Sequence, residues 1–188
     1  MIILASASPR RKELLKTIVN DFKVITADIN EEESYSLPPF DAVRDIAYRK
    51  GIEIHEKHPS DVVISADTIV ILDDQIIGKP KDEEDAKRIL RLLSGKKHLV
   101  VTAYCIFKNV MVLEKLVMSD VIFNELSDEL IDAYVASGSP LDKAGAYGVQ
   151  DNDKFPIVKE VKGSMNNVIG FPIENIEEDL KYFIKKTT

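Results

Sequence analysis

A carboxylate and a hydroxyl interrupt the most apolar segment of the sequence. Residues 62–72 have the sequence V-V-I-S-A-D-T-I-V-I-L, and this run of β-branched residues between turn-forming residues predicts a buried β-strand. An ionised carboxylate such as Asp67 is costly in an apolar strand unless it is paired or binds a metal. Two interpretations therefore stay open for Asp67 and its neighbour Thr68: a satisfied hydrogen-bond network, or an active site.

Three cations follow the first predicted strand, at the start of a predicted helix. Ser8 and the proline after it are typical of an N-cap and a first helical position. Arg10, Arg11 and Lys12 then fall in the first turn, where the helix dipole is already positive and cations are unfavourable. Either these side chains extend into water, or they bind an anion such as phosphate together with the free backbone N–H groups. We favour the anion site, because a broken local rule is expected at functional positions.

Further charged and polar side chains lie in predicted loops or at helix edges. The acidic segment that contains Glu31 is either solvated surface or a source of ligands for a hard cation. Lys50 falls near the apolar side of a predicted helix, where it either snorkels or points its charge into a pocket. Lys79 is held between a glycine and a proline. Gln150 ends a glycine-containing loop, residues 137–150, of the kind that often carries binding residues.

The hydrophobic pattern predicts strands and helices that alternate along the chain. Strands are expected at residues 2–5, 22–26, 62–72, 98–108, 110–124, 155–161 and 167–171. Helices are expected to begin near residues 8, 41, 82, 127 and 175, with Asn175 as the N-cap of the last one. No internal repeat or interdomain linker interrupts this pattern.

The composition is that of an ordinary globular chain, with 188 residues, of which 45% are hydrophobic and 30% charged. At this length we expect one domain spanning residues 1–188. The formal net charge of -7 argues against general nucleic-acid binding, which usually leaves a basic surface. No apolar run is long enough to span a bilayer, and the N-terminus lacks the basic region of a secretory signal. We therefore expect neither a nucleic-acid partner nor a membrane partner.

The cysteine and the histidines add no catalytic group to this inventory. The single Cys105 lies in an apolar segment without a basic neighbour, which predicts a buried and unreactive thiol. One cysteine excludes an intramolecular disulfide and fits a reducing compartment. The histidines, His55, His58 and His98, do not have the spacing of a metal-ligand cluster. The expected location is the cytoplasm.

Five stretches together resemble the Maf family of nucleoside triphosphate pyrophosphatases. They are L-A-S-A-S-P-R-R-K-E-L-L from Leu4, S-A-D-T from Ser65, G-K-P from Gly78, L-S-G-K-K-H from Leu93 and D-K-A-G-A-Y-G-V-Q from Asp142. They occur in the family's order and with its spacing. The first and the last are long enough to be specific, whereas S-A-D-T or G-K-P alone is a weak signal.

The resemblance implies an elongated α/β (mixed α+β) fold, with helices flanking a central mixed β-sheet and two lobes around a cleft, as in Maf and ITPase proteins. It implies Mg2+-dependent hydrolysis of a nucleoside triphosphate to the monophosphate and pyrophosphate, with Mn2+ able to replace Mg2+. It also implies the removal of unwanted nucleotides and assembly as a homodimer. The last stretch resembles the branch that acts on dTTP and UTP.

The resemblance also assigns roles to individual positions. Asp67 matches the catalytic carboxylate, and Glu31 matches an acidic residue near the metal that Asp67 would share. The positions associated with substrate choice are Arg10, Thr68 and Gln150, and those of the phosphate pocket are Ser8, Arg11, Lys50 and Lys79. Two departures stand out: Gly51 replaces a common alanine, and M-N-N-V-I-G-F-P lacks the aromatic residues usual in that segment.

These residues allow a mechanism in which Asp67 orients or deprotonates a water that attacks the α-phosphorus. Thr68 and Gln150 would hydrogen-bond the edge of a pyrimidine. A competing hypothesis is a non-catalytic nucleotide-binding regulator of cell division. Other phosphohydrolases are disfavoured, because the chain lacks a G-x-x-x-x-G-K-[ST] loop and has Ile69 where an aspartyl-phosphate phosphatase needs a second aspartate.

Overall fold

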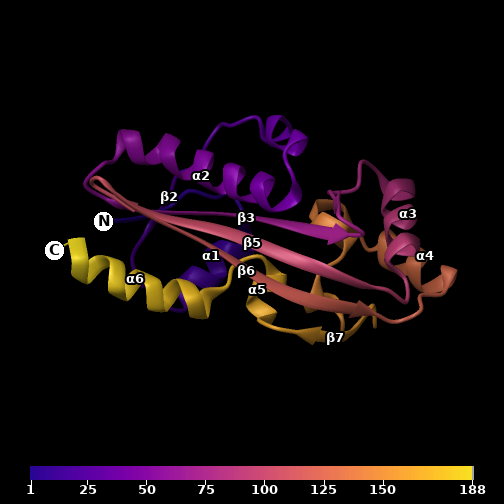
Figure 1. Cartoon of the computed structure of the whole chain (residues 1–188). Helices are drawn as coiled ribbons and strands as arrows, with labels where there is room; N and C mark the ends of the chain where they lie inside the picture. The colour runs from indigo at the N-terminus through magenta and orange to yellow at the C-terminus, as the bar shows by residue number, and fades with distance from the viewer. Residues whose placement is uncertain (188) are drawn as a thin grey trace. The chain divides into compact units, whose positions relative to one another are not determined.

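Strands and helices alternate along much of the chain (Figure 1). The structure is a computed structural model and describes residues 1–187. The strands are β1 (Ile2–Leu4), β2 (Lys23–Val24), β3 (Val62–Leu72), β4 (Gln75–Ile77), β5 (Lys97–Lys108), β6 (Met111–Phe123) and β7 (Val158–Lys162). The α-helices are α1 (Pro9–Lys16), α2 (Pro39–Lys57), α3 (Glu83–Leu93), α4 (Asp128–Ala136), α5 (Met165–Ile169) and α6 (Ile173–Thr187). Short 3-10 helices are η1 (Glu31–Ser36), η2 (Ser139–Asp142), η3 (Ala144–Ala146) and η4 (Val149–Asp151).

Within residues 1–187 the strands form one seven-stranded sheet in the order β2-β1-β3-β5-β6-β7, with β4 paired to β3. β1 is parallel to both β2 and β3, with Ile2 opposite Val62. β4 is antiparallel to β3, and β7 is antiparallel to β6 with a register shift at Ile122 and Phe123. The predicted fold class, a central mixed sheet with flanking helices, is therefore confirmed.

The chain divides into two compact units, and β3, β5 and β6 contribute residues to both. The first unit contains residues 1–68, 102–117 and the C-terminal segment from Gly170. The second contains residues 69–101 and 118–169.

In the first unit, α2 covers one face of the strands and α1 and α6 cover the other (Figure 1). Successive residues of β3 point to opposite faces because the side-chain period of a strand is two. Ile64 and Ala66 pack in a buried cluster with residues of α1 and α6, including Leu15. Ser65 points to the other face, where its hydroxyl donates to the carbonyl of Ala47 on α2 at 2.7 Å. This alternation decides which helix each functional residue of β3 meets.

In the second unit, α3 and α4 pack on a separate apolar cluster. This cluster includes side chains from the parts of β3, β5 and β6 that belong to the second unit. Both helices begin as the sequence predicts. Asp82 accepts from the backbone N–H of Asp85 at 2.8 Å, and Ser127 accepts from that of Leu130 at 3.2 Å. The start of a helix can therefore be predicted from the sequence where a capping side chain accepts a hydrogen bond from a backbone N–H of the first turn.

Two predictions near the C-terminus are wrong. Residues 167–171 do not form a strand, because Ser164 caps the short helix α5 by accepting from the N–H of Asn167 at 3.0 Å. An apolar run of this length does not distinguish a helix from a strand. Gly170, with φ of 115°, follows α5 in a conformation that favours glycine. Asn175 is not an N-cap, since α6 begins at Ile173 and its first turn is preceded by a proline.

Gly51 of α2 provides space for an aromatic ring. A Cβ atom at this position would lie 2.2 Å from Cε2 of Phe107 and 2.5 Å from Oγ of Ser65. Gly51→Ala gains up to about 1 kcal/mol of helix propensity. We expect overpacking, typically about 1–3 kcal/mol, to outweigh this gain and lower the free energy of unfolding measured in urea.

Phe107→Leu is the matched second substitution, because it removes the clashing edge of the ring. The double variant should lose less free energy of unfolding than the two single variants lose together. We expect a coupling energy of at least about 0.5 kcal/mol. A Gly51→Ala variant as stable as the parent protein would show that the ring moves aside at no cost.

His98, on β5 in the second unit, should make stability pH-dependent. Burial lowers the pKa of His98 to about 4. Its Nε2 lies 2.8 Å from the hydroxyl of Tyr147, and among the described residues its Nδ1 is buried without a hydrogen-bond partner. Between pH ~6.5 and ~4 the unfolded chain binds more protons at this position than the folded one. Stability is therefore lost as the pH falls, by about 3 kcal/mol over the whole window.

The test is the free energy of unfolding measured at several pH values. His98→Gln cannot titrate and should flatten the slope in this window, while Tyr147 retains a polar neighbour. An unchanged slope in the variant would assign the acid sensitivity to other groups.

Candidate functional site

Asp67 lies on the α2 face of β3, where it meets a lysine. Its Oδ1 accepts from Nζ of Lys50 at 2.9 Å, and the two side chains are 11% and 15% exposed. Lys50 therefore does not simply snorkel into water. It compensates a carboxylate that the strand has removed from solvent, as a buried charge requires.

Lys50 also binds a second carboxylate, so that two acidic side chains converge on one ammonium group. Nζ of Lys50 lies 2.7 Å from Oε1 of Glu31, whose side chain is 41% exposed. Glu31 opens η1, where Asn30 caps the turn by accepting from the N–H of Glu32 at 3.2 Å. Glu33, on the same turn, pairs with Arg49 at 2.8 Å. Within the acidic segment it is thus Glu31 that faces Lys50 and Asp67.

The environment of Asp67 shifts its protonation equilibrium. Burial raises the pKa of the Asp67 carboxyl, while the positive charges of Lys50 and Arg11 act in the opposite direction. Glu31 adds a further negative charge that raises this pKa. A carboxylate whose pKa lies above its ordinary value accepts a proton more readily, which is the property a general base needs near neutral pH.

The donor set suits a cation that is held jointly by protein and substrate. Residues 1–187 contain no group of three or more His, Cys, Asp or Glu side chains placed to hold a metal ion. Mg2+, however, is usually bound by one or two carboxylates together with phosphate oxygens and waters. Glu31 and Asp67 supply two carboxylates that already converge on the positive charge of Lys50. These residues therefore fit the expected ion.

Arg11 forms a hub on the other face of β3. Its guanidinium donates to the carbonyl oxygens of Gly170 at 2.9 Å and Ala66 at 2.7 Å. It also donates to the hydroxyls of Ser6 at 3.2 Å and Thr68 at 3.1 Å. Four of the five N–H groups of a guanidinium are thereby used within the protein. This accounts for one of the three cations in the first turn of α1 without a bound anion.

The hydroxyl of Thr68 is saturated by its neighbours. Oγ1 accepts from Arg11, donates to the carbonyl of Gly170 at 3.2 Å and lies 2.9 Å from the hydroxyl of Thr102. A threonine hydroxyl has one donor and two acceptor sites, so these three contacts occupy all of them. A direct bond from Thr68 to a pyrimidine would have to replace one of these contacts.

The remaining predicted residues of the first unit lie at the start of α1. Ser8 is the N-cap, as predicted, with its Oγ 3.5 Å from the N–H of Arg11. Arg10 is half-buried and Lys12 is exposed. No acidic residue occupies the first turn, so the helix dipole and these side chains keep the positive character that the sequence predicts.

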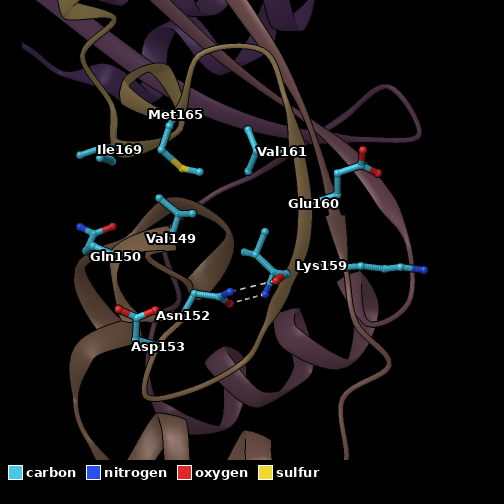
Figure 2. A pocket seen from close by; sticks show the side chains of 10 residues that line it. Val149, Gln150, Asn152, Asp153, Lys159, Glu160, Val161, Met165 and Ile169 are labelled. Atoms are coloured by element: carbon cyan, nitrogen blue, oxygen red, sulfur yellow. Dashed lines mark hydrogen bonds between the residues drawn. The ribbon is translucent and has the colours of Figure 1, made fainter.

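Lys79 and Gln150 lie in the second unit. Lys79 is exposed in the loop after β4, and the carbonyl of the preceding Gly78 accepts from the N–H of Gly145 at 3.1 Å. Gln150 is exposed on η4, at the rim of a pocket of about 340 Å³ (Figure 2). Apolar side chains of η4, β7 and α5 line this pocket, namely Val149, Val158, Val161, Met165 and Ile169.

Three residues around Asp67 and Thr68 escaped the sequence analysis. Thr102 and Gly170 contact Thr68, but they are distant in sequence and belong to segments that gave no sign of a shared site. Tyr35 lies in the electrostatic field of Asp67 and Glu31. Burial raises the pKa of its hydroxyl, and the two carboxylates raise it further. In the sequence, the one sign that Tyr35 could belong to the site was its position among the acidic residues of the segment that contains Glu31.

Arg11→Lys tests whether this arginine is a structural hub. A lysine ammonium presents three donors at one point and cannot reproduce the planar fork of the guanidinium. Because buried carbonyl groups would lose their donors, we expect the free energy of unfolding to fall by about 3 kcal/mol. Lys12→Ala, an exposed change in the same turn, should leave stability within about 0.5 kcal/mol. Unchanged stability combined with weaker phosphate binding would contradict the structural role and support the predicted place of Arg11 in the phosphate pocket.

Comparison with known proteins gives this site a family context. Residues 1–183 match the family described as Maf-like protein. A protein of Thermococcus onnurineus named dTTP/UTP pyrophosphatase is 46% identical over 174 residues, which cover 93% of each chain. A protein of Bacillus mycoides with the same name is 41% identical over 187 residues, covering 100% of this chain and 97% of that protein.

Solved structures show the same fold at low sequence identity. The Ham1 protein of Staphylococcus aureus aligns with a TM-score of 0.54 and 13% identity, over 96% of this chain and 97% of its own. A HAM1 protein of Coxiella burnetii aligns with a TM-score of 0.54 and 14% identity, over 96% and 98%. At this identity the likeness concerns the fold alone.

Proposed function

Because this chain belongs to the family of Maf-like proteins, we propose that it is a nucleoside triphosphate pyrophosphatase acting on dTTP and UTP. Relatives that are 41–46% identical over nearly their whole length carry the name dTTP/UTP pyrophosphatase. The observation that carries the proposal is the buried Asp67, held by Lys50 beside Glu31. This arrangement provides a proton acceptor and a cation at one position.

In the proposed reaction, Asp67 accepts a proton from a water molecule whose oxygen attacks the α-phosphorus. A bond forms between the water oxygen and phosphorus, and the bond from phosphorus to the bridging oxygen of the pyrophosphate breaks. Lys50 holds Asp67 in place and offsets the negative charge of the substrate. Arg10 and the N-terminus of α1 supply further positive charge for the phosphates. The family resemblance assigns a phosphate-binding role to Lys79 as well.

Glu31 and Asp67 are the residues that would hold Mg2+, since both place a carboxylate beside Lys50 and such an ion needs only one or two carboxylates from the protein. When bound, such an ion neutralises phosphate charge and polarises the phosphorus toward attack. Mg2+ dependence, replacement by Mn2+, nucleotide housecleaning and a homodimer stay predictions of the family resemblance. A single domain and a cytoplasmic location stay predictions from chain length and cysteine content. Among residues 1–187, no helix combines the length and the apolar character needed to cross a membrane.

The test is a panel of nucleoside triphosphates with Mg2+, with monophosphate, diphosphate, pyrophosphate and orthophosphate resolved as products. We expect monophosphate and pyrophosphate, formed fastest from dTTP and UTP. Asp67→Asn retains the size of the side chain but removes its basicity. It should lower kcat by about 10²- to 10⁴-fold while circular dichroism shows a folded protein.

Two neighbouring glutamates provide a matched control for the acidic turn. Glu31→Gln should raise the Mg2+ concentration needed for half-maximal rate, whereas the exposed Glu32→Gln should not. Release of orthophosphate would contradict pyrophosphatase chemistry. A folded protein that turns over none of the nucleotides would favour the non-catalytic regulator of cell division.

A further inference from the structure

The turn that carries Gln150 is held by one buried tyrosine hydroxyl. Tyr134 of α4 is fully buried, and its hydroxyl accepts from the backbone N–H of Gly148 at 2.9 Å. The same hydroxyl donates to Oδ2 of Asp151 at 2.8 Å. Gly148 and Asp151 flank the two residues at the tip of the turn, and the N–H of Asp151 also donates to the carbonyl of Gly148 at 3.0 Å. Both ends of the turn are thus tied to a single atom.

Further contacts fix the turn on either side of this clamp. Ser139 donates to the same Oδ2 of Asp151 at 2.6 Å. Asn152 bonds the backbone of Val158 on β7 twice, at 3.0 and 2.7 Å, as the dashed lines in Figure 2 show. Burial raises the pKa of the Tyr134 hydroxyl, which therefore stays protonated and able to donate. The turn has little freedom left in this unit.

Gly148 also provides the space in which the side chain of Gln150 lies. A Cβ atom on Gly148 would lie 3.0 Å from Oε1 of Gln150 and 2.8 Å from Cε of Lys143. Oε1 of Gln150 therefore lies close to Gly148, the residue whose N–H Tyr134 binds. An amide carries both donors and an acceptor, so it discriminates between bases only when its position is fixed.

We propose that Tyr134 and Asp151 are positioning residues that fix Gln150 and thereby set the choice between nucleobases. This inference rests on the proposed function and on the role of Gln150 in substrate choice. The two residues do not touch the substrate. They act through the turn, which places the glutamine amide opposite one pattern of donors and acceptors on the base.

Asp151→Ala and Asp151→Asn form the decisive pair. Both hydroxyls donate to one oxygen of Asp151, so the amide oxygen of asparagine can accept both bonds, whereas alanine accepts neither. The ratio of kcat/KM for dTTP to that for dCTP should fall at least ten-fold in Asp151→Ala and stay within three-fold in Asp151→Asn. The loss should appear mainly in KM for dTTP, with kcat changed less than three-fold.

A double variant shows whether the effect passes through the glutamine. In a Gln150→Ala background, Asp151→Ala should lower the dTTP preference no further, because no amide remains to be positioned. Asp132→Ala, an exposed change on α4, is the control for loss of a carboxylate. If Asp151→Ala does not fold, Ser139→Ala removes one of the two donors to Asp151 and should give a smaller shift in the same direction.

The outcomes separate the two proposals. If the parent protein forms no monophosphate and pyrophosphate, the proposed function fails and this inference fails with it. If the parent protein prefers dTTP and Asp151→Ala keeps that preference, only the clamp is overturned. An equal loss of preference with and without Gln150 would likewise overturn it, because Asp151 would then act by another route.

Discussion

The buried contact between Lys50 and Asp67 is the constraint around which the first unit is built. A carboxylate in the middle of an apolar strand cannot stay ionised without a cation close to it. Helix α2 must therefore cross β3 where its lysine reaches the strand, at 2.9 Å from the carboxylate. Glu31 joins the same ammonium, which brings the acidic turn against α2. One group of three charges thus determines both how these elements pack and how Asp67 is compensated.

The pleat of β3 separates two tasks that adjacent residues perform. Asp67 points toward α2 and Lys50, while Thr68 points to the face that holds Arg11. The Arg11 hub joins α1, β3 and the turn at Gly170 through bonds to main-chain oxygens. These bonds hold the backbone of β3 next to Asp67 in place. Asp67, the proposed reactive group, and Thr68, the partner of the structural Arg11, therefore point to opposite faces of a single strand.

Features that depend on neighbouring residues in the sequence could be predicted. Contacts between residues far apart along the chain could not. Asp67 was evident because its charge contrasts with its strand, and Ser8 because a serine before a proline caps a helix. The partners of Arg11 were not evident, since Gly170 is 159 residues away along the chain. Part of the strand predicted at residues 167–171 instead belongs to α5, where Asn167 makes buried bonds to Val100 and Ser119 that exist only after the sheet has formed. Family resemblance supplied the roles, but not the contacts that exhaust the hydrogen-bonding capacity of Thr68.

The glycine beneath the ring of Phe107 has a consequence for how this sequence could have diverged. The family resemblance leads us to expect alanine at the position of Gly51, yet here the ring occupies the space that its methyl group would need. The ring is also stacked on His55, with centroids 5.4 Å apart, so moving it aside would disturb a second contact. The two positions therefore constrain the order of evolutionary change. Acquiring the small residue at 51 before the large ring at 107 avoids the overpacked intermediate, and a return to alanine costs less stability once the ring has been lost.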